Sequence, residues 1–85
     1  MKFYYVYILA NHNDRHFYAG FSTDLVKRIK EHNDGKIQFT KSKSPWKIIY
    51  YEAFLNKYDA LRREKYLKST KGKTTLKSML REFLN

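Results

Sequence analysis

The sequence predicts a small α/β (α+β) domain, with helices flanking a three-stranded, mainly antiparallel sheet in the order β-β-α-β-α-α. Two aromatic and β-branched runs separated by a polar turn predict the first strands, and apolar stripes bounded by capping residues predict the helices. A chain of 85 residues supports a single domain, residues 1–85. Because it contains no cysteine, no disulfide or thiolate zinc site can supplement the core, so its eight Tyr and six Phe have to contribute to it.

The first two strands form a predicted hairpin. Residues 3–9 are a continuous aromatic and β-branched run, typical of a strand covered on both faces. The polar residues 11–14 predict a turn, and residues 16–21 are the expected partner strand.

A helix is expected next, over about residues 24–33. Ser22 or Thr23 is a suitable N-cap, and Leu25, Val26 and Ile29 form its apolar stripe. The helix is expected to end at residues 33–35, where Gly35 follows two polar residues.

The second half of the chain predicts a loop, a strand and two helices. Residues 36–45 are polar and read as an exposed loop, whereas 46–54 have strand character, with Trp46 expected in the core. Asn56 can cap a helix over about 57–68. After a connection at 69–73, a third helix carries four apolar residues at helical spacing: Leu76, Met79, Leu80 and Phe83.

The chain carries a formal charge of +10. Residues 1–34 hold five basic and four acidic side chains, so the excess lies downstream of them. Such a charge favours a polyanionic partner, most commonly nucleic acid, although a ribosomal or acidic-lipid partner fits the same charge. The apolar run at residues 3–10 is too short to cross a bilayer, and the start of the chain lacks a signal-peptide pattern, so a soluble, cytoplasmic protein is expected.

One carboxylate occupies an unusual position. On the second predicted helix, Glu64 lies in the middle of the face formed by Ala60, Leu61 and Leu67. Burying an unpaired carboxylate is costly, so Glu64 needs a cation. An ion pair with Lys68, one turn later, is one solution, and a bound metal is the other.

Two further side chains that could take part in a reaction lie one turn apart on the first predicted helix. Arg28 can hold a phosphate through two parallel hydrogen bonds, and His32 can exchange a proton near neutral pH. A solvated helix edge, with Arg28 paired to Asp24 or Glu31, is the alternative.

Two tyrosines of the hairpin are further candidates for the site, because Tyr7 and Tyr18 lie on adjacent predicted strands. Strand tyrosines are commonly packing residues, and four others are interpreted that way: Tyr4, Tyr5, Tyr50 and Tyr51.

Four short motifs occur in order and at compatible distances. They are Tyr5-Val6-Tyr7, Tyr18-Ala19-Gly20, the segment 24–35 with Arg28 and His32, and the segment 60–68 with Glu64. Together they resemble the GIY-YIG endonuclease family, in particular small stand-alone members related to the N-terminal nuclease module of the bacterial excision-repair subunit UvrC. The resemblance extends from residue 3 to about residue 80. Tyr5 stands where the name-giving motif has Gly, Ala19 stands where it has Ile, and the late Asn of some branches has no match.

The resemblance implies a DNA endonuclease of repair or recombination that uses one Mg²⁺ or Mn²⁺ held by Glu64. Tyr7, assisted by His32 or by water of the metal's shell, would deprotonate the attacking water, provided that nearby cations lower its pKa. Arg28 would stabilise the phosphate, and Tyr18 would orient it or the nucleophile. Gly20 would allow the DNA a close approach.

Basic residues outside these motifs are expected to hold the DNA backbone, with low sequence specificity. They are Lys36, Lys41, Lys43, Lys71, Lys73 and Lys77. No small-molecule cofactor or membrane is expected, and the protein is expected to be a monomer or a homodimer. Two other interpretations stay open: a catalytically weak or silent nucleic-acid-binding module, and a protein-interaction domain on a ribosome or repair complex.

Overall fold

The computed structural model describes all 85 residues. Its strands are β1 (Tyr4–Asn11), β2 (Phe17–Ser22) and β3 (Trp46–Phe54). Its helices are α1 (Leu25–Asn33), α2 (Lys57–Lys68), α3 (Thr70–Met79) and the short α4 (Arg81–Leu84), with a 3₁₀ turn, η1, at Lys41–Lys43. The predicted order β-β-α-β-α-α is confirmed, and α4 is an addition to it.

The sheet has the strand order β2-β1-β3, and both pairings are antiparallel, as predicted. In the centre of β1, Tyr7 pairs with Gly20 of β2 and with Tyr51 of β3. The pairing of β1 with β3 shifts register between Ile8 and Leu9, and the two strands stay paired beyond this point. β2 is therefore an edge strand beside the central one.

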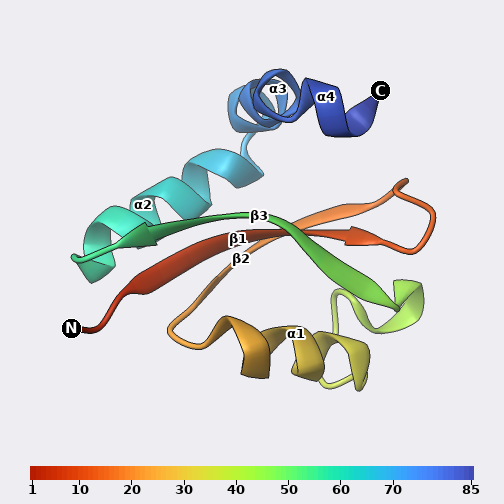
Figure 1. Cartoon of the computed structure of the whole chain (residues 1–85), viewed down its shortest axis with the longest axis horizontal. Helices are drawn as coiled ribbons and strands as arrows, with labels where there is room; N and C mark the ends of the chain where they lie inside the picture. The colour runs from red at the N-terminus through yellow and green to blue at the C-terminus, as the bar shows by residue number, and fades with distance from the viewer.

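Helices cover both faces of this sheet (Figure 1), with α1 on one side and α2, α3 and α4 on the other. Alternate residues of β1 enter two separate cores. Val6 and Ile8 pack toward α2 and α3, whereas Tyr7 and Leu9 pack with Trp46 and α1. The expectation that this strand is covered on both faces is confirmed.

Helix ends follow local hydrogen bonding, with one correction to the sequence-based assignment. The N-cap of α1 is Asp24 and not Ser22 or Thr23, because the Asp24 carboxylate accepts the amide of Lys27 at 3.0 Å. The expected end of α1 is confirmed at Gly35, whose φ is +76°.

The cap of α2 agrees with the prediction, but the segment that follows it does not. Asn56 accepts the amides of Tyr58 and Asp59 at the start of α2, as expected. Residues 69–73 are not a connection, because Ser69 caps α3 and Gly72 lies in its first turn. A Cβ at Gly72 would lie 1.8 Å from the carbonyl oxygen of Tyr66, so only glycine lets the two helices follow each other this closely.

Several side chains differ from the expected burial. Val26, placed in the apolar stripe of α1, is 80% exposed, and Tyr51 is 55% exposed on β3. Residues 36–45 are not wholly an exposed loop, because Thr40 is completely buried within it. Trp46 is buried, as predicted. None of the helices combines the length and the apolar character that crossing a bilayer requires.

Candidate active site

The centre of the site is the phenol of Tyr7, which lies on the α1 face of the sheet with only 2% of the residue exposed. Its ring lies against Gly20, its cross-strand partner: a Cβ at Gly20 would come within 2.3 Å of both the Cζ and the hydroxyl oxygen of Tyr7. Gly20 is itself buried. The structure therefore gives Gly20 a role that the sequence did not suggest, which is to make room for the tyrosine ring.

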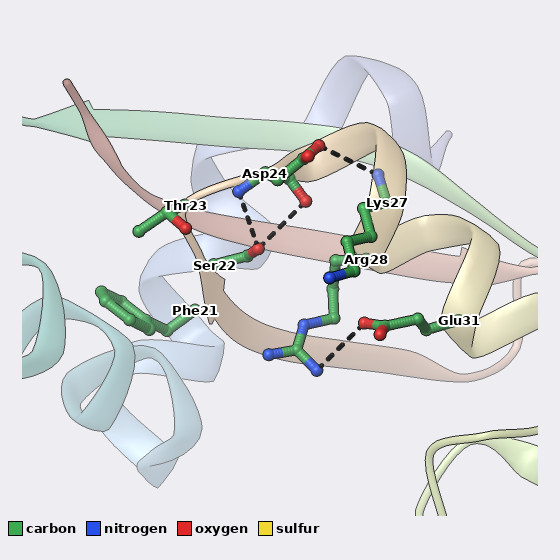
Figure 2. A pocket seen from close by; sticks show the side chains of 7 residues that line it. All are labelled: Phe21, Ser22, Thr23, Asp24, Lys27, Arg28 and Glu31. Carbon is green, nitrogen blue, oxygen red and sulfur yellow. Dashed lines mark hydrogen bonds and ion pairs between the residues drawn. The ribbon is translucent and has the colours of Figure 1, made fainter. Parts of the chain in front are cut away.

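Arg28 enters this region from the first turns of α1, beside a surface hollow at the junction of β2 and α1 (Figure 2). Its guanidinium lies 3.4 Å from the carboxylate of Glu31, one of the two pairings expected for a solvated helix edge. The junction is held by Ser22, whose hydroxyl accepts the amide of Asp24 and donates to its carbonyl. This hydrogen bonding sets where α1 begins, and so where Arg28 lies.

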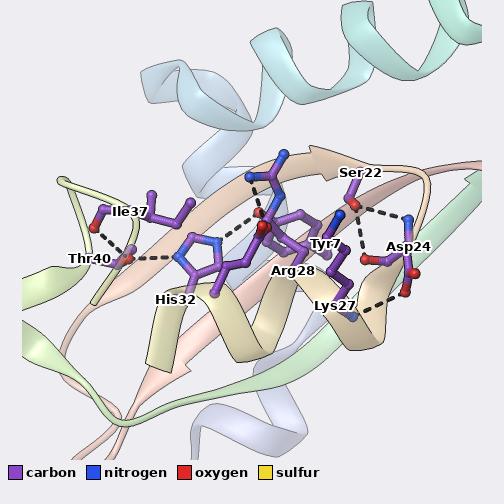
Figure 3. Close-up of polar contacts among 9 residues, drawn as sticks. Tyr7, Ser22, Asp24, Lys27, Arg28, His32, Ile37 and Thr40 are labelled. Carbon is purple, nitrogen blue, oxygen red and sulfur yellow. Dashed lines mark hydrogen bonds and ion pairs between the residues drawn. The ribbon is translucent and has the colours of Figure 1, made fainter. Parts of the chain in front are cut away.

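His32 lies one turn further along α1 and is completely buried. Its Nε2 lies 2.8 Å from the Tyr7 hydroxyl, and its Nδ1 lies 2.6 Å from the hydroxyl of Thr40 (Figure 3). The Thr40 hydroxyl donates in turn to the carbonyl of Ile37 at 3.3 Å. A continuous hydrogen-bonded chain thus links a strand, a helix and the segment after it.

Thr40 is the member of this chain that the sequence reasoning missed. Its segment is rich in lysine and in hydroxyl and amide side chains, which is the composition of an exposed loop. No signal in the sequence marks one of these hydroxyls as buried. Only the fold shows that the buried imidazole of His32 needs a second hydrogen-bonding partner, and that Thr40 supplies it.

Tyr18 and Glu64 close the site at the edge formed by β2. The Tyr18 ring lies 6.4 Å from that of Tyr7 and 5.1 Å from that of His32, centroid to centroid. Lys68 reaches the same edge from α2, with its ammonium 5.3 Å from the Tyr18 ring and 3.2 Å from the Glu64 carboxylate. The ion pair with Lys68, one of the two alternatives for Glu64, is therefore present. Tyr18, Arg28 and Glu64 all lie near enough to Tyr7 to shift its pKa.

Burial sets the charge state of the two central groups. Desolvation raises the pKa of Tyr7 well above its ordinary value, and Tyr18, Glu64 and Glu31 raise it further, while Arg28 lowers it. The nearby cation thus does not lower the phenol's pKa below normal, contrary to the sequence-based expectation. Desolvation and Arg28 lower the pKa of His32 to about 4. Both groups are neutral at pH 7, so His32 has one nitrogen free to accept a proton.

Comparison with known proteins agrees with this arrangement. The GIY-YIG catalytic domain, as a family model, matches residues 3–77. The chain belongs to the GIY-YIG family. The match includes every residue of the hydrogen-bonded chain and also Arg28 and Glu64.

Relatives place this GIY-YIG chain in the UPF0213 group. The UPF0213 protein CPE1444 of Clostridium perfringens is 45% identical over 65 residues, which are 75% of this chain and 69% of that protein. The UPF0213 protein SH2523 of Staphylococcus haemolyticus is 37% identical over 78 residues, 91% of this chain and 94% of that one. The solution NMR structure of the UPF0213 protein BH0048 from Bacillus halodurans has 35% identity and a TM-score of 0.55, covering 91% of this chain and 84% of that chain.

The oxygen donors of this GIY-YIG site fit only a cation that keeps most of its own water. No group of three or more His, Cys, Asp and Glu side chains lies together in the chain. Glu64 offers one carboxylate with 20% of its side chain exposed, and the carboxylate of Glu31 is paired with Arg28. Mg²⁺ accepts such a site, because it retains several waters and needs one or two carboxylates. Zn²⁺ does not fit, because it requires three or four protein ligands.

The lysines predicted to hold DNA are all exposed, and none lies within 4.0 Å of a carboxylate. The structure does not bring them onto one face of this GIY-YIG domain. Lys36, Lys41 and Lys43 lie on the segment that follows α1, whereas the other three belong to α3 on the opposite side of the sheet (Figure 1).

Proposed function

We propose that the protein is a metal-dependent endonuclease that hydrolyses phosphodiester bonds of DNA with low intrinsic sequence specificity. The observation that carries this proposal is the 2.8 Å contact between the Tyr7 hydroxyl and the neutral His32, at a position where the charges of Arg28 and Glu64 both act on Tyr7. Simple binding of nucleic acid would not require a buried tyrosine and histidine in hydrogen-bonding contact, with an arginine and a carboxylate near enough to act on the tyrosine.

The hydrogen-bonded pair can move one proton away from an attacking water. The Tyr7 hydroxyl gives its proton to Nε2 of His32 and takes the proton of the water. The water oxygen bonds to phosphorus as the bond from phosphorus to the leaving oxygen breaks, and the leaving oxygen is protonated from solvent. The imidazolium that forms then releases this proton to solvent through Tyr7, which balances the proton that the leaving oxygen took from solvent.

The remaining residues act on the phosphate and on the geometry. Arg28, whose side chain is 36% exposed at the rim, can neutralise charge on the phosphate oxygens. Glu64 would hold Mg²⁺ or Mn²⁺ in place of the Lys68 ammonium, and the bound ion would supply positive charge for the leaving oxygen. Tyr18, packed against both Tyr7 and His32, would orient the nucleophile or the phosphate.

DNA would be held by the exposed lysines, with those of residues 36–43 on the same side of the sheet as Tyr7. Contacts of this kind give affinity without sequence choice. A cytoplasmic location and a role in DNA repair or recombination belong to the same proposal.

Nicking of supercoiled plasmid with Mg²⁺ or Mn²⁺ tests the proposal. Glu64→Ala is expected to lower cleavage at least about 100-fold while DNA affinity stays within about twofold, because the carboxylate acts on the reaction and not on the ground-state complex. Lys68→Ala is the matched control, since it removes the other half of the ion pair and leaves the carboxylate free. That variant should still cleave, and at a lower Mg²⁺ concentration than the wild type.

Two outcomes would overturn the assignment. If the wild type and Glu64→Ala both bind plasmid and both leave it intact, the protein is a nucleic-acid-binding module. If neither binds DNA at low salt, a protein-interaction role is indicated. An RNA transcribed from the plasmid and tested in parallel shows whether the protein distinguishes DNA from RNA.

A further inference from the structure

The first inference concerns Thr40, and it rests on the proposed nuclease function. We propose that Thr40 is a positioning residue that holds His32 in the tautomer whose Nε2 accepts the proton of Tyr7. The three side chains are each at most 2% exposed, and their polar atoms are separated by 2.8 and 2.6 Å. Figure 3 shows His32 held between the other two.

The available donors and acceptors decide in which direction the hydrogen bonds from Tyr7 to Ile37 run. The carbonyl of Ile37 can only accept, and it lies 3.3 Å from the Thr40 hydroxyl. If Thr40 donates to it, Nδ1 of His32 donates to Thr40 and Nε2 accepts from Tyr7, so every donor is paired. In the reverse direction the Tyr7 proton has no partner within the protein, because His32 is the only protein group in hydrogen-bonding contact with its hydroxyl. Leaving a buried donor unpaired costs about 1–3 kcal/mol, so the first direction is favoured.

The position of Thr40 in the sequence connects the histidine with the expected DNA-binding lysines. It lies in the segment that carries Lys36, Lys41 and Lys43, which form no ion pairs. The residues expected to contact the DNA backbone and the anchor of the histidine therefore belong to one short piece of chain. DNA bound along this segment would hold Thr40 against His32.

Nitrogen NMR of His32 in the wild-type protein tests the tautomer without any need for activity. We expect Nδ1 to resonate as a protonated nitrogen and Nε2 as an unprotonated one. The opposite pattern would overturn the proposal, whether or not the protein is a nuclease.

Substitutions then test whether the tautomer matters. Thr40→Val keeps the shape but removes the hydroxyl, and it is expected to mix the two tautomers and to slow cleavage about 10- to 100-fold, by analogy with the loss of a hydrogen-bonding partner behind a metal-ligating histidine. Thr40→Ser should restore both the NMR pattern and the rate to within about threefold. DNA affinity should not change in either variant.

A Thr40→Val protein with the wild-type tautomer and rate would contradict the positioning role. If this variant does not fold, the NMR result on the wild type and the rate of Thr40→Ser still decide the matter. If no variant or wild type cleaves DNA, the nuclease proposal fails, and the tautomer is judged by NMR alone.

A separate observation concerns the residue before Thr40. Phe39 is 85% exposed, whereas its neighbour is completely buried, so anchoring of the segment presents an aromatic ring to solvent. Phe39 belongs to neither core cluster and pairs with no other aromatic ring. It is surrounded in the sequence by the unpaired lysines at 36, 41 and 43.

We infer that Phe39 stacks on an unpaired base of the substrate, and this also rests on the proposed function. Positive charge beside an exposed aromatic ring is the combination that binds single-stranded nucleic acid, where stacking contributes about 1–3 kcal/mol per base. The inferred substrate class is therefore DNA with an unpaired or mismatched nucleotide near the cut.

Binding measurements with Phe39→Ala test this inference independently of cleavage. Affinity for single-stranded or mismatched oligonucleotides should fall about 10-fold, which lies within the stated stacking range, and affinity for fully paired duplex should fall less than twofold. Val26→Ala, which removes another exposed apolar side chain, is the matched control and should change neither. Equal losses on both kinds of DNA, no loss at all, or a loss of self-association in sedimentation would overturn it.

Discussion

The two faces of the sheet are built from alternate residues of one strand, yet they differ in chemistry. Toward α2 and α3, Val6 and Ile8 pack with Ala60, Leu67 and Leu76, and all five are apolar. Toward α1, the buried groups include a phenol, an imidazole and a hydroxyl, joined by hydrogen bonds. An apolar face contributes stability without directional requirements, whereas a buried polar face requires every partner in place. The apolar groups of the α2 face stabilise the fold, whereas the proposed reaction would use the polar groups of the α1 face together with Glu64, which α2 contributes at the edge of the sheet.

The largest expected effect is on the α1 face. Tyr7→Phe removes one hydroxyl and should lower the cleavage rate about 1,000-fold, because general-base assistance contributes 100- to 10,000-fold. Stability should fall only by about 1–2 kcal/mol, since one buried nitrogen of His32 loses its partner. Plasmid nicking and thermal unfolding measure the two effects. A variant that cleaves normally would show that the phenol is a packing group.

The opposite result is expected on the α2 face. Leu67→Ala removes a buried side chain, 2% exposed, and should lower the free energy of unfolding by about 2–5 kcal/mol. Below its melting temperature the variant should still cleave at nearly the wild-type rate. Denaturant unfolding gives the stability, and Ile8→Val, at about 0.5–1.5 kcal/mol, serves if the larger deletion does not fold. A fold-intact variant with greatly reduced cleavage would remove the distinction between the faces.

The polar face should also make stability depend on pH. The pKa of His32 is about 4 in the folded protein against 6.5 ordinarily, so the unfolded chain binds more protons between these values. The free energy of unfolding therefore falls as the pH falls through this window, by roughly 3 kcal/mol in all and by about 2 kcal/mol between pH 7 and pH 5. His32→Gln should flatten this dependence in denaturant titrations. An unchanged slope would mean that another group causes it.

Crowding at the tyrosine ring gives a smaller effect on the same face. Gly20→Ala would place a methyl group 2.3 Å from the Tyr7 hydroxyl, so the ring has to move. Cleavage should fall roughly 100-fold, since a displacement of about 1 Å at a reacting group can have that effect. Combined with Tyr7→Phe, it should add little, because both changes act through one group. Additive losses would indicate a separate role for Gly20.

The smallest effects are expected from substitutions of the lysines. These substitutions also compare the two sides of the sheet. Replacing Lys36, Lys41 and Lys43 by Ala should reduce the slope of log affinity against log salt by up to about 2.7 on duplex DNA, if each contacts one phosphate. The same change at Lys71 and Lys73, with Lys77, should reduce it less, because these belong to the side away from Tyr7. Equal reductions would mean that DNA contacts both sides.

Particular residues show how far the sequence could predict this site. Tyr7, Arg28, His32 and Glu64 could be proposed because they stand in motifs that resemble those of the GIY-YIG family. Asn56 and Gly35 could also be predicted as helix ends. Asn56 caps α2 through local hydrogen bonds, and Gly35 follows α1 with a backbone conformation that glycine favours. Thr40 could not be found this way, since its burial depends on a contact with His32 and not on its neighbours in the sequence.

The sequence by itself determined the order of elements and the alternation of β1 between two cores, because these depend on periodicity and local propensity. Tertiary structure alone decided the rest. It made Gly20 a space for the Tyr7 ring, buried Thr40 and exposed Phe39. It also raised the pKa of Tyr7 where sequence reasoning expected it to be lowered. Burial and desolvation arise only when distant segments pack together, so no local pattern encodes them.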